Sequence, residues 1–318
     1  MGSDTLIGRA YSFADAYARP LVRPREPGGS EPQAPVQPIE NDAVASRTRN
    51  SLEIQAFGLR RSGNHALIAW IAQQYPKPIV FLNNARPFSD PFTNYLMGRV
   101  PNAVPHRRLN EEEAEQLRAM QKDLLLISYE DVLIRKLDRM EVLPQRRLWL
   151  GESGRTRRLL LMRDFYNWIA SRVRLFENKG RPTDDILDRL DQQIRLWIMY
   201  AREFVGETQH LKSVETVYVR FDRWSDDQSY RSEVLEHLGI TMRDNTRSIV
   251  PKAGGGSSFD GTRFSGNAET MDLLNRWSHL EAPECRSLLR LIAQRRDEID
   301  EYNRQIFGME YPFGITPP

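Results

Sequence analysis

The sequence has very little cysteine and no excess of charge of either sign. Cys285 is its single cysteine among 318 residues, so the chain forms neither an internal disulfide nor a cysteine-based metal site, and this usage is typical of a reducing compartment. Against 45 lysines and arginines stand 43 aspartates and glutamates, which leaves a formal net charge of +2. Such a balance argues against bulk attraction to nucleic acid or to a membrane surface.

Long apolar runs are also missing. Stretches such as residues 67–72 and 124–127 are far shorter than the roughly 20 apolar residues that cross a bilayer. Asp4, Arg9 and Asp15 interrupt the first 20 residues, so we find no signal-peptide core there. The expectation is a soluble, cytoplasmic protein without a membrane span and without a nucleic-acid partner.

The N-terminal segment differs in composition from the rest of the chain. Six of the 19 prolines fall between Pro20 and Pro38, next to Gly28 and Gly29, and such a stretch supports neither a helix nor a strand ladder. We therefore expect a leader and a disordered linker over residues 1–50. Residues 51–318 are expected to form one domain, because 40% hydrophobic and 9% aromatic content is enough for a sizeable core.

The apolar pattern after residue 50 indicates an α/β fold. Continuous aliphatic runs predict strands, and 3.6-residue periodicity predicts helices between them. Continuously apolar strands that alternate with helices are typical of a central parallel sheet flanked by helices on both faces. The predicted strands are residues 52–57, 79–82, 123–128, 159–162 and 216–221.

Helices and loops fill the intervals between these strands. The predicted helices are residues 66–74, 111–120, 164–177, 183–205, 230–238, 268–280 and 284–306, with Gly239 ending the fifth of them. Residues 83–106 lack periodicity and are expected to be a long functional loop. A glycine-rich loop is expected at residues 253–256.

The first motif that indicates chemistry is GLRRSGNH at residues 58–65, between a predicted strand and a predicted helix. A Gly-x4-Gly loop before a helix is typical of a phosphate cradle, since glycines let backbone N–H groups approach oxygens at the helix N-terminus. A nucleoside-triphosphate loop would continue with Lys and Ser or Thr, whereas this chain has Asn64 and His65. The alternative is an ordinary strand–turn–helix with surface arginines.

The second motif places Arg163 directly after a predicted strand and Ser171 eight positions later in the next helix. The carboxyl ends of strands in α/β sheets are where ligand-binding groups lie. Taken alone, this pattern is equally typical of a surface ion pair and an exposed serine.

Together the two motifs resemble the sulfotransferases that use 3′-phosphoadenosine 5′-phosphosulfate (PAPS). The family's 5′-phosphosulfate loop reads Pro-Lys/Arg-Ser/Thr-Gly-Thr-Thr, and residues 61–65 match its position, with Arg61 in place of the catalytic Lys or Arg. The spacing of Arg163 and Ser171 is that of the family's 3′-phosphate motif. The resemblance covers about residues 52–260 and implies a P-loop-like, sulfotransferase-type fold. It also implies that the donor is bound by residues of the first motif: Arg60, Arg61, Ser62, Gly63, Asn64 and His65.

Two later segments fit the same resemblance. Residues 217–224, followed by Leu238 and Gly239, resemble the family's Tyr-Glu-Asp-Leu … Leu-Gly segment, which implies that Phe221 lies near the nucleotide. The loop from Pro251 resembles the family's Arg-Lys-Gly loop for the 3′-phosphate, which implies roles for Lys252, Gly254 and Gly255. A plain linker is the alternative for this loop. Trp70, one turn into the helix after the first motif, is a candidate stacking surface for adenine, with a core position as the alternative.

The expected reaction is transfer of a sulfonyl group from PAPS to a hydroxyl or amine of a small-molecule or carbohydrate acceptor. Arg61 suits the leaving phosphate, because a guanidinium is always charged and offers several donors, and no metal is then required. Glu130, where the family carries a Thr-His segment, and His65 are the candidate general bases, and we favour Glu130. The alternatives are a P-loop nucleotide kinase or hydrolase, and a non-catalytic nucleotide-binding module.

Overall fold

The structure is a computed structural model of the chain. It describes residues 48–76, 79–93, 97–99, 109–137, 145–180, 183–252, 255–309 and 311–313. The chain divides into two units, residues 1–45 and residues 46–318, and all the described residues belong to the second. The predicted leader and linker therefore lie outside the described residues, apart from residues 48–50.

Within the described residues, six strands form one sheet in the order β3-β2-β4-β1-β5-β6. Their bounds are β1 Asn50–Gly58, β2 Ile79–Asn83, β3 Met97–Arg99, β4 Lys122–Glu130, β5 Ser153–Met162 and β6 Thr216–Arg220. β1 pairs in parallel with β4 and β5, β2 pairs in parallel with β4, and β6 pairs in parallel with β5. The predicted parallel α/β sheet is confirmed.

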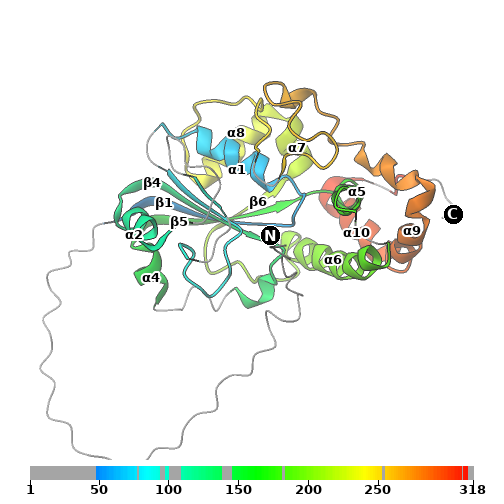
Figure 1. Cartoon of the computed structure of the whole chain (residues 1–318), viewed down its shortest axis with the longest axis horizontal. Coiled ribbons are helices and arrows are strands. Elements are labelled where there is room, and N and C mark those ends of the chain that lie inside the picture. Colours follow the sequence, from blue (N-terminus) through cyan, green and yellow to red (C-terminus); the bar gives the residue numbers. More distant parts are fainter. Residues whose placement is uncertain are drawn as a thin grey trace, which may run out of the picture. The chain divides into compact units, whose positions relative to one another are not determined.

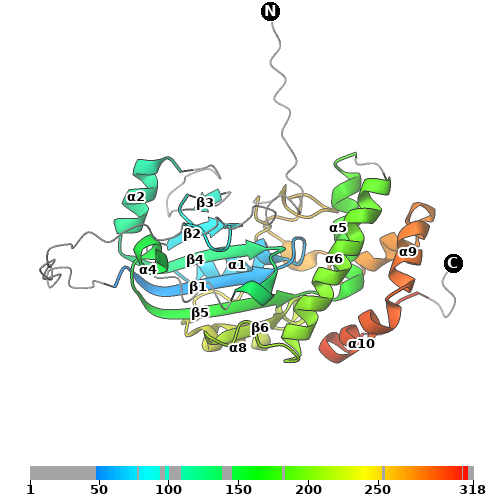
Figure 2. The same ribbon diagram turned by 90° about the horizontal axis from the view of Figure 1, so that it is seen from below.

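Helices connect these strands and cover both faces of the sheet. Figure 1 shows α1, α7 and α8 above the sheet and α6 below it, and Figure 2 shows α9 and α10 beyond α5 and α6, farther from the strands. The α-helices are α1 Asn64–Gln73, α2 Glu111–Ala119, α4 Gln145–Leu150, α5 Phe165–Glu177, α6 Thr183–Phe204, α7 Phe221–Asp226, α8 Gln228–Leu238, α9 Arg286–Ala293 and α10 Arg296–Phe307. The short 3₁₀ segments are η1 Ile134–Lys136, η3 Ala268–Thr270, η4 Arg276–Glu281 and η5 Pro283–Cys285.

Side chains of each central strand alternate between two hydrophobic cores. In β4, Leu124 and Leu126 pack in the core beneath α1, α7 and α8, while Leu125 and Ile127 pack in the core that includes α5, α6, α9 and α10. Neighbouring β5 repeats the pattern with Leu161 on the first face and Leu160 on the second. Because alternate side chains of a strand point to opposite faces, a continuous aliphatic run fits a strand that is buried on both sides.

Several helix ends follow signals that are legible in the sequence. Asp164 caps α5 by accepting a hydrogen bond from the Asn167 backbone N–H at 2.9 Å. Asn110 and Glu113 form a capping box at the start of α2. Gly239, at φ 70°, ends α8 as predicted, in the left-handed conformation that glycine adopts without steric cost.

The structure corrects two predicted helices near the C-terminus. Residues 268–280 form no continuous helix, because only the short segments η3 and η4 are helical there. Residues 284–306 form two helices instead of one, since Arg295, at φ −129°, leaves the helical conformation between α9 and α10. Apolar side chains of both regions are buried, including those of Ala268, Leu280, Leu288 and Ile299, but local hydrogen bonds close 3₁₀ turns between the helical segments.

The predicted loop over residues 83–106 is wrong in part. β3 lies within it and pairs antiparallel with β2, with Leu82 opposite Gly98. A strand of three residues has too short a periodic pattern to be found in the sequence. Among the described helices, none is both long enough and apolar enough to cross a membrane.

A buried carboxylate at the end of α6 provides a test of the fold. Glu203 is fully buried and accepts hydrogen bonds from the backbone N–H groups of His210 at 2.9 Å and Leu211 at 2.8 Å, and from the Thr208 hydroxyl at 2.6 Å. Glu203→Ala leaves these donors unpaired, so we expect the free energy of unfolding in urea to fall by roughly 2–5 kcal/mol. The exposed Glu236→Ala serves as control and should change it by less than about 0.5 kcal/mol; equal effects of both variants would contradict the assignment.

Candidate functional site

The residues predicted to carry chemistry converge on one edge of the sheet. Gly58 ends β1, and it pairs with Glu130, the last residue of β4, and with Leu161 near the end of β5. The first motif follows β1, Arg163 follows β5, and Phe221 follows β6. Since the strands are parallel, their carboxyl ends share one edge, which is where α/β sheets bind ligands.

A cavity lies at this edge and encloses about 750 Å³ of empty space, its open mouth included. Most of the predicted site residues line the cavity: Arg61, Gly63, Asn64, His65, Glu130, Arg163, Ser171 and Phe221. The sequence motifs, up to 160 positions apart, are thus brought together in space.

Two glycines of the first motif are required by close contacts. A Cβ atom at Gly58 would lie 2.0 Å from Asn64 Oδ1, and one at Gly63 would lie 2.1 Å from Phe221 Cε2. Gly63 also has φ 100° and caps α1, a conformation that side chains with a Cβ rarely adopt. The loop therefore fits closely against both its own helix and the segment after β6.

Hydrogen bonds from neighbouring elements fix the backbone in the middle of the loop. The Arg60 backbone N–H donates to Asp131 Oδ1 at 2.9 Å, and its carbonyl oxygen accepts from Trp168 Nε1 at 2.9 Å. Arg61 has φ 71°, a left-handed conformation that costs a non-glycine residue about 1–2 kcal/mol. Strained backbone of this kind clusters at ligand-binding sites.

The guanidinium of Arg163 is the most enclosed charge of the site. Its residue is 4% exposed, and its Nη1 donates to Ser171 Oγ at 3.2 Å and to the Arg61 carbonyl oxygen at 3.3 Å. Nη2 donates to the Leu273 carbonyl oxygen at 2.5 Å, while Nε has no partner among the described residues. These acceptors are all neutral, so the hydrogen bonds bring no compensating negative charge.

Burial lowers the pKa of the four arginines that line the cavity among the described residues. It lowers the pKa of Arg163 to about 9, where attraction by Asp164 opposes it and weaker repulsion by Arg276 and by Arg61 adds to it. Burial, with repulsion from Arg172 and Arg276, lowers the pKa of Arg61 to about 10. A bound polyanion would favour the charged form of each guanidinium, because an opposite charge nearby offsets both effects.

Glu130, His65 and Asn64 form a polar cluster on the side of the cavity next to β4. Asn64 Nδ2 donates to Glu130 Oε1 at 3.3 Å and to the Leu59 carbonyl oxygen at 3.0 Å. His65 Nε2 lies 2.9 Å from Asn83 Oδ1 and 3.9 Å from Glu130 Oε1. Since Asn83 Oδ1 is an acceptor that also receives the Ser128 hydroxyl at 2.9 Å, Nε2 carries the proton and Nδ1 is the basic nitrogen of His65.

Arg60 and Ser62 stand apart from the cavity lining. The Arg60 guanidinium pairs with Glu130, with Nε 3.4 Å from Oε2, and is 46% exposed. Ser62 is buried, and its hydroxyl has no hydrogen-bond partner within the part of the chain that the structure describes. Lys252 is exposed and does not line this cavity, nor does Gly255, while Gly254 lies outside the described residues. The predicted donor contacts of these residues stay predictions.

The structure adds lining residues that the sequence motifs did not indicate. Arg276, at the start of η4, and Arg247 bring the number of arginines lining the cavity to four. Burial lowers the pKa of both. Trp224 also lines the cavity. Trp70 lies in the core and packs edge-on against the Trp224 ring, with ring centroids 5.9 Å apart. Arg247 and Arg276 stand in segments without a recognisable motif, so no sequence signal would have found them.

No known family model matches the chain, and no curated protein matches it. Solved structures do. Mouse sulfotransferase SULT7A1 complexed with PAP is 10% identical over 80% of this chain and 87% of its own, with a TM-score of 0.41. The sulfotransferase domain from the Synechococcus PCC 7002 olefin synthase is 10% identical over 84% and 98%, with a TM-score of 0.41. The sulfotransferase domain from the curacin biosynthetic pathway is 14% identical over 76% and 96%, with a TM-score of 0.40. Sulfotransferases are thus among the solved structures to which this chain is similar.

Gly63 provides a test of the loop geometry. Gly63→Ala adds left-handed strain and a collision with Phe221, whereas Gly180→Ala, at φ 60° with no atom within 4 Å, adds strain alone. We expect the control to lower the free energy of unfolding by about 1–2 kcal/mol and Gly63→Ala to lower it by a further 1–3 kcal/mol or so from overpacking. Urea unfolding measures both. Equal losses would show that Phe221 does not fix the loop.

Proposed function

We propose that the chain is a sulfotransferase that moves the sulfonyl group of PAPS to a hydroxyl or amine of a small-molecule or carbohydrate acceptor. The observation that carries the proposal is the meeting of Arg61, Arg163 and Ser171 in one cavity at the carboxyl edge of the sheet. These residues come from the two motifs that resemble the family's 5′-phosphosulfate and 3′-phosphate sites.

In this proposal the donor occupies the cavity with one phosphate at each motif. The 5′-phosphosulfate lies over the loop of residues 58–65, where the first turn of α1 leaves backbone N–H groups without helical partners. Ser171 Oγ and the Arg163 guanidinium, 3.2 Å apart, bind the 3′-phosphate. The adenine lies near Phe221 and Trp224, whose ring centroids are 5.8 Å apart.

The transfer step needs a base and stabilisation of the leaving group. The acceptor hydroxyl gives its proton to the base as its oxygen bonds to sulfur, and the bond from sulfur to the 5′-phosphate oxygen breaks with its electron pair staying on that phosphate. Arg61 stabilises the charge that develops there, because a guanidinium offers several fixed donors. Glu130 takes the proton in the pathway that we favour, and His65 Nδ1 is the alternative acceptor.

The contacts of Asn64 and His65 argue against a nucleotide kinase. At these positions a nucleoside-triphosphate loop supplies a lysine for the terminal phosphates and a hydroxyl for magnesium. Here Asn64 donates back to its own loop and to Glu130, and His65 is paired with Asn83. Neither side chain supplies a cation or a hydroxyl ligand, so the cavity favours a donor whose phosphates are bound by arginines.

Donor binding tests the proposal. We expect 3′-phosphoadenosine 5′-phosphate to bind without magnesium in calorimetric titrations, and Arg163→Ala and Ser171→Ala to weaken this binding, because each removes a partner of the 3′-phosphate. A hydrogen bond to a charged group contributes about 1.5–3 kcal/mol, which corresponds to a loss of roughly 10- to 150-fold.

Two controls make this titration decisive. Arg195→Ala changes an arginine on α6 whose side chain is 68% exposed and paired with Asp191, and it should bind the nucleotide like the parent chain. ATP with magnesium is the competing ligand. Tight, magnesium-dependent ATP binding without any response to the 3′-phosphorylated nucleotide would contradict the proposal, as would unchanged affinity in both site variants.

The identity of the base is tested by a pair of near-isosteric substitutions. Glu130→Gln keeps an oxygen for Asn64 but removes the basic carboxylate, so we expect kcat to fall by about 10²- to 10⁴-fold while donor affinity changes little. His65→Asn should then have the smaller effect on kcat. The reverse order in a transfer assay with saturating donor would make His65 the base.

A further inference from the structure

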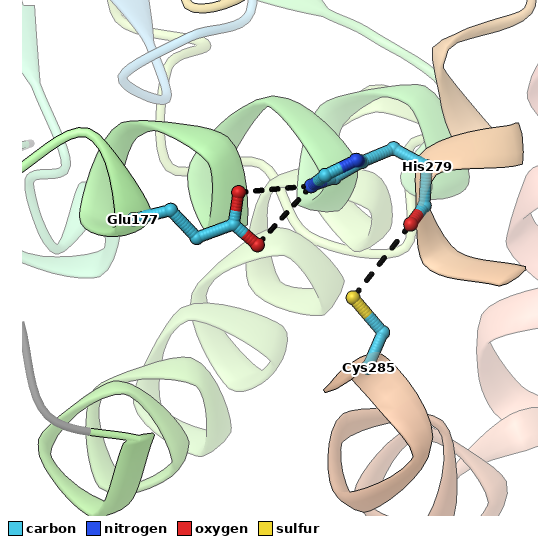
Figure 3. A group of neighbouring side chains, drawn as sticks. All are labelled: Glu177, His279 and Cys285. Atoms are coloured by element: carbon cyan, nitrogen blue, oxygen red, sulfur yellow. Dashed lines mark hydrogen bonds and ion pairs between the residues drawn. The ribbon is translucent and has the colours of Figure 1, made fainter. Parts of the chain in front are cut away.

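A second cluster of reactive side chains lies away from the cavity at the carboxyl edge of the sheet, which is called the anion-binding cavity below. Glu177 ends α5, His279 belongs to η4, and Cys285 ends η5. One ligand atom from each of these residues lies within 4.8 Å of the other two. Figure 3 shows the imidazole of His279 directed at the Glu177 carboxylate, with the sulfur of Cys285 beside them.

Hydrogen bonds link the three residues of the cluster. His279 Nε2 lies 3.0 Å and 3.2 Å from the two oxygens of Glu177, and the Cys285 thiol donates to the His279 carbonyl oxygen at 3.7 Å. All three residues also line a cavity of about 1030 Å³ of empty space, its open mouth included. None of them lines the anion-binding cavity.

The three donors are the types that zinc takes in proteins. Cysteine sulfur binds zinc at about 2.3 Å, histidine nitrogen and carboxylate oxygen at about 2.0–2.2 Å. Tetrahedral geometry then places the ligand atoms about 3.3–3.6 Å from one another. The cluster is already this close between Glu177 and His279, and a shift of about 1 Å, within the reach of side-chain rotation, brings the remaining pairs together.

Charge and size also suit a divalent cation. A thiolate and a carboxylate together balance the two charges of zinc, while the imidazole binds as a neutral ligand. Arg174, whose Nη1 lies 3.2 Å from Glu177 Oε2, is the neighbouring cation and orients the carboxylate. A hard ion such as magnesium prefers oxygen ligands, so the sulfur and nitrogen favour zinc.

We propose that Glu177, His279 and Cys285 bind a zinc ion through a carboxylate oxygen, Nε2 and Sγ, with water from the adjoining cavity as the fourth ligand. On binding, the S–H bond of Cys285 breaks, the sulfur keeps the electron pair and coordinates zinc, and the proton passes to solvent.

The position of the cluster gives the ion a structural role. α5 carries Ser171 six residues before Glu177, and η4 carries Arg276 three residues before His279. Both Ser171 and Arg276 line the anion-binding cavity. A zinc ion that links Glu177 to His279 thus cross-links the two elements that present these side chains, and metal binding favours the arrangement that the anion requires.

Cobalt(II) provides a direct test, because Cys285 is the only cysteine of the chain. A cobalt–thiolate bond absorbs in the near ultraviolet by charge transfer from sulfur, so this band reports Cys285 alone. We expect the full chain, titrated with cobalt chloride, to develop the band at one equivalent and to lose it when zinc is added. The Cys285→Ser variant should show no band, and His279→Ala should weaken cobalt binding at least 10-fold.

A control variant and a measurement of thermal unfolding complete the test of the zinc site. His237→Ala, an exposed histidine on α8, is the matched control and should titrate like the parent chain. Zinc at a hundredfold excess over its Kd should raise Tm by roughly 5 °C in the parent chain and not in Cys285→Ser. No nucleotide is present in these experiments, so their result is independent of the sulfotransferase proposal.

Absence of the band from folded protein would overturn the proposal. So would a band that His279→Ala and Glu177→Gln leave unchanged, because cobalt would then be bound by the thiolate without the other two ligands.

Discussion

The guanidinium of Arg163 lies out of bulk water, and its hydrogen bonds go to neutral oxygens. Removing a cation from water is costly unless an opposite charge compensates it. Arg61, Arg247 and Arg276 line the same cavity and are also partly desolvated. Arg276 and Arg61 repel the Arg163 guanidinium, and the carboxylates of Asp164 and Asp260 offset part of the cost at Arg163 and Arg276. A bound polyanion would supply further compensating charge. The other features of the site follow from the need to keep these desolvated guanidinium groups in place.

The fold holds these charges together in spite of their repulsion. Two hydrophobic cores cover the sheet on both faces, and two buried tryptophans fix the backbone of the loops that follow β1 and β5. Trp197 Nε1 donates to the Arg163 carbonyl oxygen at 3.0 Å, and Trp168 Nε1 donates to that of Arg60. Buried aromatic rings of α5 and α6 therefore position the loops after β1 and β5, and rigid support of this kind lets a binding site remain strained.

Much of this arrangement could be predicted from the sequence, and the reasons are local. Continuous aliphatic runs at residues 123–128 and 159–162 are incompatible with a one-sided sheet, and Gly58 and Gly63 mark the loop that follows the central strand. The sequence predicted neither the place of Arg276 in the cavity nor the cluster of Glu177, His279 and Cys285. Both arrangements depend on side chains that meet only after η4 and η5 pack on α5. The single cysteine predicted no cysteine-based metal site, whereas the zinc site proposed above combines Cys285 with ligands from distant segments. Arg158 is fully buried and Arg146 pairs with the buried Glu53, although both belong to a run of basic residues before the predicted strand that leads to Arg163.

We propose that the carboxyl edge of the sheet forms one anion-binding cavity for a nucleotide with two separated phosphates. The decisive experiment is a crystal structure with 3′-phosphoadenosine 5′-phosphate. We expect the 5′-phosphate at the N-terminus of α1 within hydrogen-bond distance of the loop around Arg61, and the 3′-phosphate at Arg163 and Ser171. A nucleotide bound elsewhere, or bound here with its 3′-phosphate in solvent and away from Arg163, would contradict it.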